Sequence, residues 1–564
     1  MANSTSRALD KIEIVGHGVD DHRQKYWKLK VAGSRIDLPP YSSLELLEPR
    51  KRLYPELADA GCSLLSSGSQ KALLHMLENY EHGATPDFYV VPRLGSFGEF
   101  YVRPRSIIGN LAQPVERALG SLDADMLQKY RWRGSLRRWQ EQIGSLCDGN
   151  SRLMFAASMA CTGPILPFVA GPRTGGFQIT GPAETGKTTA AMVAGSIWGC
   201  HRDSARADKG FAESWNTTIN KLDETAQAHC DALLILDETN LAGTDDKSRA
   251  HAVFNGAFRL SEGTKKKRFN EPETAAWRLY FLSTSNLSLD QLAAAGCVAL
   301  DDQHRGRLTD VVLPRGADTH GIYEDLHGYR DGAALTDAIK DRCRAVFGAP
   351  GYQLVRRIYK NKTSRFVAKN FVAKRRNVYI ELARRKAAKT GSKPLERATA
   401  RFATVYAAGC LAIHYGIFTW QRADLLRAVL ACQFDSLSSN TVSLPGSPLQ
   451  ARLTEYFAKN RANFVDLDQG KLDRARHQFG SVPGYLHTHK RTAWLYLTAD
   501  QLKRIIGTGR AADEFKRRHV NDGTLAASGS RSLVQRPVFK GNGNKGYEWV
   551  HAFRLFSVNL MVGP

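Results

Sequence analysis

The segment that most constrains how this chain folds lies near its middle, at residues 177–199, and reads FQITGPAETGKTTAAMVAGSIWG. An apolar, strand-like stretch leads into a loop with the spacing G-x-x-x-x-G-K-[ST], and an alanine-rich, helix-like stretch follows. A phosphate-binding loop requires this order, because the glycines let backbone N–H groups point at phosphate oxygens and the helix start adds the positive end of its dipole. The segment predicts an α/β fold with a P-loop nucleotide site.

The polar residues of this loop have expected roles. Lys187 would reach the outer phosphates of ATP and the hydroxyl of Thr188 would hold Mg2+, so ATP and Mg2+ are the predicted cofactors. The predicted nucleotide-binding residues are Gly181, Thr185, Gly186, Lys187, Thr188 and Thr189. The alternative is a glycine-rich turn that contains Lys and Thr without binding phosphate.

A second motif, at residues 232–238, reads ALLILDE. A fully apolar run of this length is typical of a buried parallel strand, and it would deliver Asp237 to the Mg2+ ion and Glu238 to the attacking water. The two motifs support each other because they stand in the order expected of a nucleotide hydrolase. The alternative for Glu238 is an acidic residue at the start of a helix.

Two later residues complete the predicted catalytic set. The strand-like stretch 278–286, RLYFLSTSN, ends in Asn286, which would sense the γ-phosphate; capping of the next helix is its alternative role. Arg307, in GRLTDVVLP, is the predicted arginine finger that acts on the ATP of a neighbouring subunit, and an ordinary surface arginine is the alternative. Further arginines that could reach a nucleotide are Arg305, Arg397 and Arg401.

The chain is strongly basic, with a formal net charge of +24 over 564 residues. Residues 355–393 hold fourteen Lys and Arg against the single acid Glu381, and the spacing of Phe371, Val378 and Leu382 predicts an amphipathic helix with a basic face. This favours nucleic acid as a partner, although solubility alone would also explain a basic surface. The charge does not distinguish DNA from RNA.

A second basic feature is the tip of a loop between the two later strand motifs. It consists of Lys265, Lys266, Lys267 and Arg268. Contact with a phosphate backbone is the prediction for this tip, and a merely solvated loop is the alternative.

The expected elements fall into four domains. Residues 1–120 predict an α+β domain, residues 121–325 the ATPase core, residues 326–440 a helical lid with the basic segment, and residues 447–564 a winged-helix domain. The last assignment rests on the order helix, strand, two helices and two strands around the glycine-rich KGNGNKG, the expected wing.

The cysteine spacing and the hydropathy pattern indicate in which cellular compartment the protein is expected. Neither the nine cysteines nor the 16 histidines have the spacing of a zinc or redox site, so buried free thiols are expected. No apolar run is long enough to cross a membrane, and the N-terminal residues lack the apolar core of a signal peptide. The prediction is a cytoplasmic protein without membrane contact.

With these residues assembled, the chain resembles the helicase-related family known as domain of unknown function 927. The resemblance runs from about residue 12 to 435 and rests on GSLRRWQEQIGSLCDGNSRLMFAASMA, FQITGPAETGKTTAAMVAGSIWG, SWNTTINKLDETA, LLILDE, NGAFRLSEG with KKKR, WRLYFLSTSN and RFATVYAAGCLAIHYGIFTW. That family includes helicases of mobile elements such as the staphylococcal cassette chromosome type, which are similar to minichromosome-maintenance and viral replicative helicases.

The resemblance implies an AAA+ core, a homo-oligomeric ring, expected to be a hexamer, with ATP sites between subunits, and a hairpin at residues 265–268 that lines a pore holding a single strand of DNA. A primase or a loader could be a further partner. Many relatives carry Gly-Glu where this chain has Ser285 and Asn286, but Asn is the commoner AAA+ residue there, so the expected role stays.

The combined prediction is an ATP-dependent DNA helicase or translocase that replicates a phage, a plasmid or an integrated element. Two other classes stay open. One is an ATPase switch that loads or remodels a partner on DNA, and the other is a non-unwinding origin-binding protein that needs ATP only to assemble.

Overall fold

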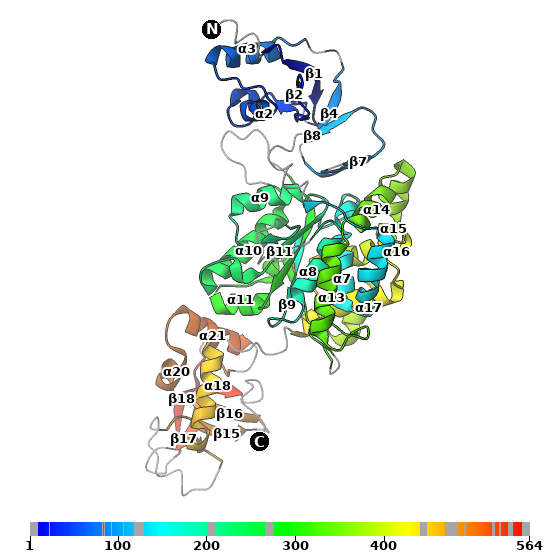
Figure 1. Ribbon diagram of the computed structural model, residues 1–564. Helices are drawn as coiled ribbons and strands as arrows, with labels where there is room; N and C mark the ends of the chain where they lie inside the picture. The colour runs from blue at the N-terminus through cyan, green and yellow to red at the C-terminus, as the bar shows by residue number, and fades with distance from the viewer. Residues whose placement is uncertain are drawn as a thin grey trace. The chain divides into compact units, whose positions relative to one another are not determined.

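The computed structural model shows a mixed α/β protein (Figure 1). It describes residues 9–21, 23–81, 83, 85–91, 93–104, 106–117, 129–200, 210–264, 276–296, 298–316, 319–439, 448–468, 482–489, 492–521, 525–528, 532–539 and 545–554. The chain divides into two compact units. The first contains Met1–Leu289 and Leu300–Ser438, and the second contains Asp290–Ala299 and Ser439–Pro564.

The first unit begins with a five-stranded sheet of order β3-β2-β1-β4-β8. Its elements are β1 (Ile12–Val19), β2 (Lys25–Val31), β3 (Tyr41–Ser42), α2 (Leu53–Asp59), α3 (Ser67–Glu78), β4 (Phe88–Val91) and β8 (Val115–Arg117). Trp27 and Leu29 of β2 pack with Leu53, Leu73 and Leu77 of the helices in a core of their own. This part of the chain therefore combines strands with two helices, the α+β composition predicted for residues 1–120.

A small antiparallel sheet follows, formed by β5 (Gly95–Phe97), β6 (Phe100–Arg103) and β7 (Ser106–Gly109). It contributes to the central core of the unit through Leu94, Phe97, Tyr101 and Val102, as does Val91 at the end of β4. The small sheet is therefore fixed to the central part of the unit.

The centre of the first unit is a parallel sheet of order β10-β11-β12-β9-β13. Its strands are β9 (Thr174–Thr180), β10 (Glu213–Ser214), β11 (Leu233–Asp237), β12 (Leu279–Ser285) and β13 (Leu308–Val312). All residues of β11 and β12 are buried, because helices cover both faces of a parallel sheet. Strand β12 lies between β9 and β11, so the ends of these three strands are neighbours.

Helices cover this sheet on both sides (Figure 1). Helices α9 (Ile219–Ala228) and α10 (Asp246–Glu262) lie on one side, and α7 (Ser151–Ala160) and α8 (Lys187–Ser196) on the other. All ten residues of α7 are buried, as expected for a segment that is apolar nearly all round.

The remaining helices of the first unit extend this core. They are α5 (Leu136–Trp139), α6 (Ser145–Cys147), α12 (Asp302–Arg307), α13 (Gly332–Ala345), α14 (Ala349–Ile358), α15 (Lys362–Thr390), α16 (Glu396–His414) and α17 (Arg422–Ser439). Helix α11 (Leu289–Gly296) follows β12 along the chain.

Helix α15 is the predicted basic helix, but its buried face differs from the expected one. The expected residues Phe371, Val378 and Leu382 are only half-buried. The fully buried stripe is Ala368, Val372, Arg376, Tyr379, Ala383 and Ala387. Three of these six residues are alanines, whose small side chains suit the packing of α15 along α16.

After Ser439, the described residues of the second unit form three α-helices and a mixed sheet. Its elements are α18 (Pro448–Asn460), β14 (Val465–Asp466), β15 (Tyr485–His489), β16 (Thr492–Leu497), α20 (Ala499–Ile506), α21 (Arg510–Asn521), β17 (Val534–Phe539) and β18 (Lys545–Arg554). The sheet order is β14-β15-β16-β18-β17. The predicted helix, strand, two helices and two strands are present, but two further strands, β14 and β15, precede β16. The centre of the predicted wing, residues 540–544, lies outside the described residues.

Three patterns expected from the sequence can be compared with the described residues. Eight of the nine cysteines lie there, and all eight are buried and free of disulfide bonds. No group of three or more His, Cys, Asp or Glu in this part of the chain has the arrangement of a metal site. Within it, too, no helix is long and apolar enough to cross a membrane.

Candidate nucleotide-binding site

The predicted phosphate-binding loop, residues 181–186, joins the carboxyl end of β9 to the first residue of α8. Two of its residues have left-handed backbone conformations, Glu184 with φ 62° and Gly186 with φ 92°. A Cβ atom at Gly186 would lie 2.5 Å from the side chain of Ile322, so only glycine fits there. The backbone N–H of Ile322 also donates a hydrogen bond to the carbonyl oxygen of Thr185 at 2.8 Å. The loop is therefore held from outside by the segment around Ile322.

Lys187 is the first residue of α8 and is 8% exposed. Its ammonium group donates a hydrogen bond to the carbonyl oxygen of Pro182, within the same loop. Burial lowers the pKa of Lys187 below its usual value, while the carboxylates of Asp237 and Glu238 act in the opposite direction. Lys187 and the two acids, far apart in sequence, therefore interact electrostatically at one place.

Asp237 and Glu238 stand at the carboxyl end of β11. Asp237 is buried, whereas Glu238 is exposed and has a left-handed backbone with φ 61°. A left-handed conformation is unusual for a residue with a side chain and is concentrated at functional sites. The chain thus turns sharply after Asp237 and presents the Glu238 carboxylate to solvent.

Thr284 of β12 connects the two acids. Its hydroxyl donates a hydrogen bond to the carboxylate of Asp237 and accepts one from the backbone N–H of Glu238 at 3.0 Å. This single side chain therefore orients both acids. The interpretation of the sequence missed Thr284, although the polar run STS at the end of an otherwise apolar strand was a signal for it.

The neighbours of Thr284 in this polar run are also bonded. Ser283 accepts a hydrogen bond from the indole N–H of Trp215 at 2.9 Å, and Ser285 accepts one from the hydroxyl of Thr239 at 2.7 Å. The run thus ties β12 to the segments beside β11.

Asn286 directly follows β12 and is half-buried. Ser285 pairs with Thr180 of β9, and the backbone N–H of Gly181 donates to the carbonyl oxygen of Ser285 at 3.3 Å. Helix α11 begins three residues later, so Ser288 rather than Asn286 precedes the helix directly. The position of Asn286 is next to the loop rather than at a helix cap.

The predicted arginine finger lies at the other edge of the sheet. Arg307 precedes β13, whose first residue pairs with Gly176 near the amino end of β9. Gly176 stands five positions before Gly181, a separation of about 16 Å along a strand. The Arg307 guanidinium lies 3.9 Å from the centre of the Phe258 ring. Burial, and after it the charge of Arg397, lowers the pKa of Arg307.

The other candidate arginines lie near Arg307. Arg401 is fully buried and donates hydrogen bonds to the carbonyl oxygen of Gly306 and the hydroxyl of Thr309, each at 2.5 Å. Burial lowers the pKa of Arg401 to about 10. Arg305 forms an ion pair with Asp302 at 3.8 Å. The structure therefore uses Arg401 to join α16 to α12 and β13, away from the loop of its own chain.

The predicted DNA-contacting residues Lys265, Lys266, Lys267 and Arg268 lie outside the described residues. On either side of them, Thr264 and Ala276 pair in an antiparallel bridge. The last described residue before this segment and the first one after it are therefore neighbours in space.

Residues 12–275 match the family model described as "Domain of unknown function (DUF927)". Over these residues, which make up less than half of the chain, the expected resemblance to this family is confirmed. The match ends before β12, so it covers only part of the stretch over which the sequence resemblance was expected. No curated protein sequence matches the chain.

Solved structures provide a second comparison. The structure described as "SCCmec type IV Cch - active helicase" aligns with 97% of this chain and 94% of its own, with a TM-score of 0.59 and 14% identity. This likeness shows a shared fold. Two others, described as the helicase of JCV and the C-terminal region of NrS-1, have TM-scores of 0.21 and 0.30. The JCV helicase aligns at 17% identity over 36% of this chain and 53% of its own. The NrS-1 region aligns at 10% identity over 97% of both chains.

Proposed function

We propose that this chain is an ATP-dependent DNA helicase of a mobile element or phage that works as a homo-oligomeric ring. The observation that carries the proposal is the convergence of the loop at 181–186, Asp237 with Glu238, and Asn286 at the carboxyl edge of one parallel sheet. Ligands of open α/β sheets bind at this edge. The fold shared with an active helicase supports the same conclusion.

The residues at this edge fit ATP with Mg2+. Gly181 and Gly186 allow the loop to pack closely, since a Cβ atom at either would meet a side chain within 2.6 Å, and the amino end of α8 favours an anion beside the loop. Lys187 would bind the outer phosphates, and Thr188 and Asp237 would hold the metal. Bound there, Mg2+ would neutralise charge on the phosphates.

The acids would divide the hydrolytic work. Asp237 is kept in place by the Thr284 hydroxyl, as expected for a residue that must hold a metal ion. Glu238 is exposed beside it, so its carboxylate can orient and deprotonate the attacking water. Asn286, at the end of β12, would contact the γ-phosphate and that water.

Arg307 supports an assembly in which ATP sites lie between subunits. It stands at the amino edge of the sheet, too far from the loop of its own chain for its side chain to reach. An arginine finger at this position would serve the site of the next subunit in a ring. Together with β12 inserted between β9 and β11, this arrangement favours the AAA+ class and a hexamer.

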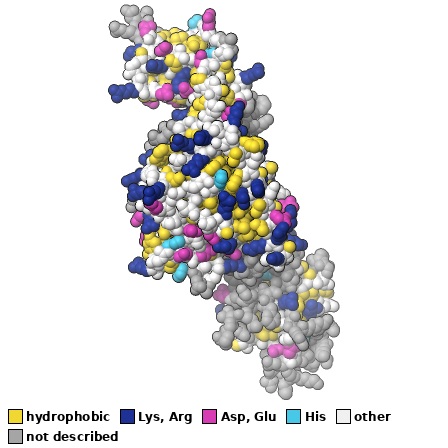
Figure 2. All heavy atoms as spheres, turned by 90° about the vertical axis from the view of Figure 1, so that its right-hand side faces the viewer, with side chains coloured by type: hydrophobic (Ala, Val, Ile, Leu, Met, Phe, Trp, Pro, Cys, Tyr) yellow, Lys and Arg dark blue, Asp and Glu magenta, His cyan; other side chains and the backbone are white. Residues whose placement is uncertain are grey.

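Basic surfaces support DNA as the substrate. Exposed lysines and arginines follow α15, among them Lys369, Lys374, Arg384 and Arg385. Figure 2 shows Lys and Arg side chains spread over this face of the first unit. Residues 265–268 would supply a moving contact in the pore, and the second unit would be a winged-helix module that binds DNA or a protein.

A strand-displacement assay tests the proposal. Lys187→Ala should abolish ATP hydrolysis and unwinding, because the outer phosphates lose their cation, whereas Lys51→Ala, at an exposed lysine of the N-terminal sheet domain, should change neither. Neutral substitutions at Lys265, Lys266 and Lys267 should spare basal ATP hydrolysis but remove its stimulation by DNA. Unwinding by the Lys187→Ala variant would refute the mechanism.

A further inference from the structure

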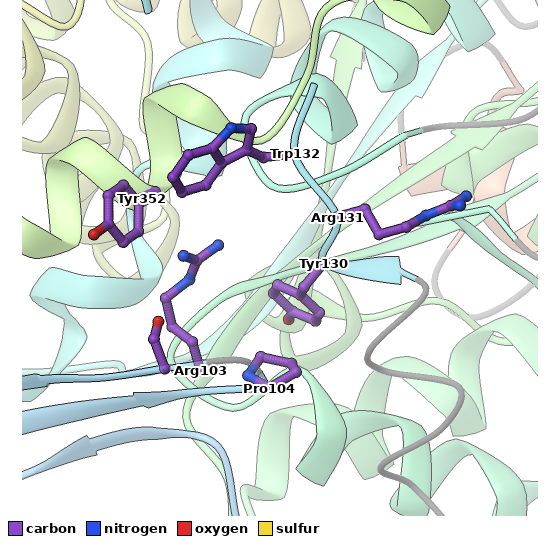
Figure 3. Close-up of a pocket in the computed structure, with 7 residues that line it drawn as sticks. Arg103, Pro104, Tyr130, Arg131, Trp132 and Tyr352 are labelled. Carbon is purple, nitrogen blue, oxygen red and sulfur yellow. The ribbon is translucent and has the colours of Figure 1, made fainter. Parts of the chain in front are cut away.

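A cavity of about 440 Å3 lies in the first unit, away from the candidate ATP site. It opens between the β6–β7 hairpin, the strap at residues 129–133 and α14 (Figure 3). The lining residues are Arg103, Pro104, Ser106, Tyr130, Arg131, Trp132 and Tyr352. A volume of several hundred Å3 is that of a small-molecule site.

Arg103 is the unusual residue of this cavity. It is 5% exposed, and its guanidinium lies 5.0 Å from the centre of the Tyr352 ring. Its Nε atom is buried without a hydrogen-bond partner among the described residues. Burial lowers the pKa of Arg103, and the groups that oppose this are tyrosine hydroxyls rather than carboxylates. A buried cation without a carboxylate is costly unless an anion binds it.

Aromatic side chains stand beside this cation. Trp132 is 54% exposed, and its ring centre lies 4.7 Å from that of Tyr352. Figure 3 shows Arg103 pointing toward Trp132 and Tyr352, while Arg131 extends away from them. A large exposed indole beside a buried guanidinium can stack a planar ring while the guanidinium binds an anion attached to it.

The strap that carries Trp132 is fixed at the far end of α8 from the candidate ATP site. A Cβ atom at Gly199 would collide with the carbonyl oxygen of Lys129, and Arg133 pairs with Phe347 in an antiparallel bridge. Nine helical residues separate Lys187 from Ser196, which corresponds to about 14 Å. The cavity is therefore separate from the ATP site.

We propose that this cavity binds one nucleotide unit of single-stranded DNA, with a phosphate on Arg103 and the base stacked on Trp132. The inference rests on the proposed function for the identity of the polymer. Single-strand binding sites combine cations that follow the backbone with aromatic rings on which bases stack, and they need no sequence-specific contacts. The cavity would hold the strand while the ATP site changes state.

Fluorescence anisotropy with the full chain, without ATP, tests this site. The probe is a labelled oligothymidylate of about twelve nucleotides, within the range of known single-strand sites. Trp132→Ala and Arg103→Met should each weaken binding by about 5- to 100-fold, and Trp132→Phe should stay within about twofold, because a phenyl ring also stacks. Basal ATP hydrolysis should not change in these variants.

A thermal melt separates a binding role of Arg103 from a structural one. Arg103→Met should melt at the same temperature as the unaltered chain or higher, because it removes a buried charge that lacks a carboxylate. Lower thermal stability together with unchanged DNA affinity would show that Arg103 only supports the fold and would overturn the inference.

Three further outcomes would overturn the proposed DNA site in the cavity. Unaltered affinity in both Trp132→Ala and Arg103→Met would overturn this inference alone, whereas no DNA binding by the unaltered chain would overturn the proposed function as well. Thymidine monophosphate is the competitor. If it displaces the oligonucleotide at equal concentration, the cavity takes a free nucleotide and the assignment to a strand is wrong.

Discussion

At the scale of single residues, the candidate ATP site depends on a side chain that carries no charge. The Thr284 hydroxyl both donates to Asp237 and accepts from the backbone of Glu238, so it positions the residue expected to hold the metal and the one expected to act on water. Such supporting bonds often matter nearly as much as the ligands themselves. The charged residues alone therefore do not define the site.

The role of Thr284 can be measured. Thr284→Val keeps the shape of the side chain but removes the hydroxyl that bonds to the Asp237 carboxylate and the Glu238 N–H, which should destabilise the fold by about 1–3 kcal/mol. We expect the kcat of ATP hydrolysis to fall roughly 10- to 100-fold, as for other supporting residues of metal sites. Thr284→Ser, which keeps the hydroxyl, should restore most of it. Wild-type kcat in Thr284→Val would contradict the assigned role.

Single residues also show why the arginines could not be sorted from the sequence. Arg307 and Arg401 both lie near the amino edge of the sheet, but Arg401 is fully buried against backbone carbonyl groups whereas Arg307 stacks on Phe258 and is only half-buried. Nothing local in the sequence distinguishes them, because burial and partners depend on residues far along the chain.

At the scale of elements, the strands with chemical motifs were predictable. β9, β11 and β12 read as apolar runs that end in polar residues, since a parallel sheet is buried on both faces. Their order was not predictable from local patterns, and it is the order that brings Asn286 beside the loop. For α15 the composition predicted a basic helix, but its buried stripe depends on how closely α16 approaches.

The sheet of the second unit has a buried histidine that should make it sensitive to acid. His551 in β18 is 5% exposed, and burial lowers its pKa to about 4. In an unfolded chain a histidine titrates near pH 6.5. Above that pH the residue is neutral in both states, and as the pH falls toward 4 only the unfolded state gains a proton, so stability is lost.

The expected loss between pH 6.5 and 4 is about 3 kcal/mol, from a pKa difference of about 2.5 units. Calorimetry of the full chain at a series of pH values measures it as a fall in the melting temperature of the second unit. His551→Gln should remove most of this pH dependence, whereas His75→Gln, at an exposed histidine of α3, should leave it intact. An identical pH profile in His551→Gln would show that other groups cause the loss.

At the scale of the whole molecule, the chain places complementary parts of the proposed ATP site on opposite edges of one sheet. The loop, the acids and Asn286 are at the carboxyl edge, and Arg307 is at the amino edge. A single chain cannot bring them together, but a head-to-tail ring brings each edge to the opposite edge of its neighbour. The positive charge of +24 would then be repeated around the ring, where it would attract DNA.

Mixing of variants tests this arrangement. Arg307→Ala subunits keep an intact Lys187, and Lys187→Ala subunits keep an intact Arg307, so each variant alone should be inactive in ATP hydrolysis. When the two are co-expressed, random assembly into head-to-tail rings should leave about one quarter of the interfaces with both intact residues, and about that share of the activity should return. Recovery of this size requires Arg307 to act from a neighbour, because no subunit in the mixture carries both residues. Rings that assemble from both variants yet remain inactive would exclude Arg307 as the finger.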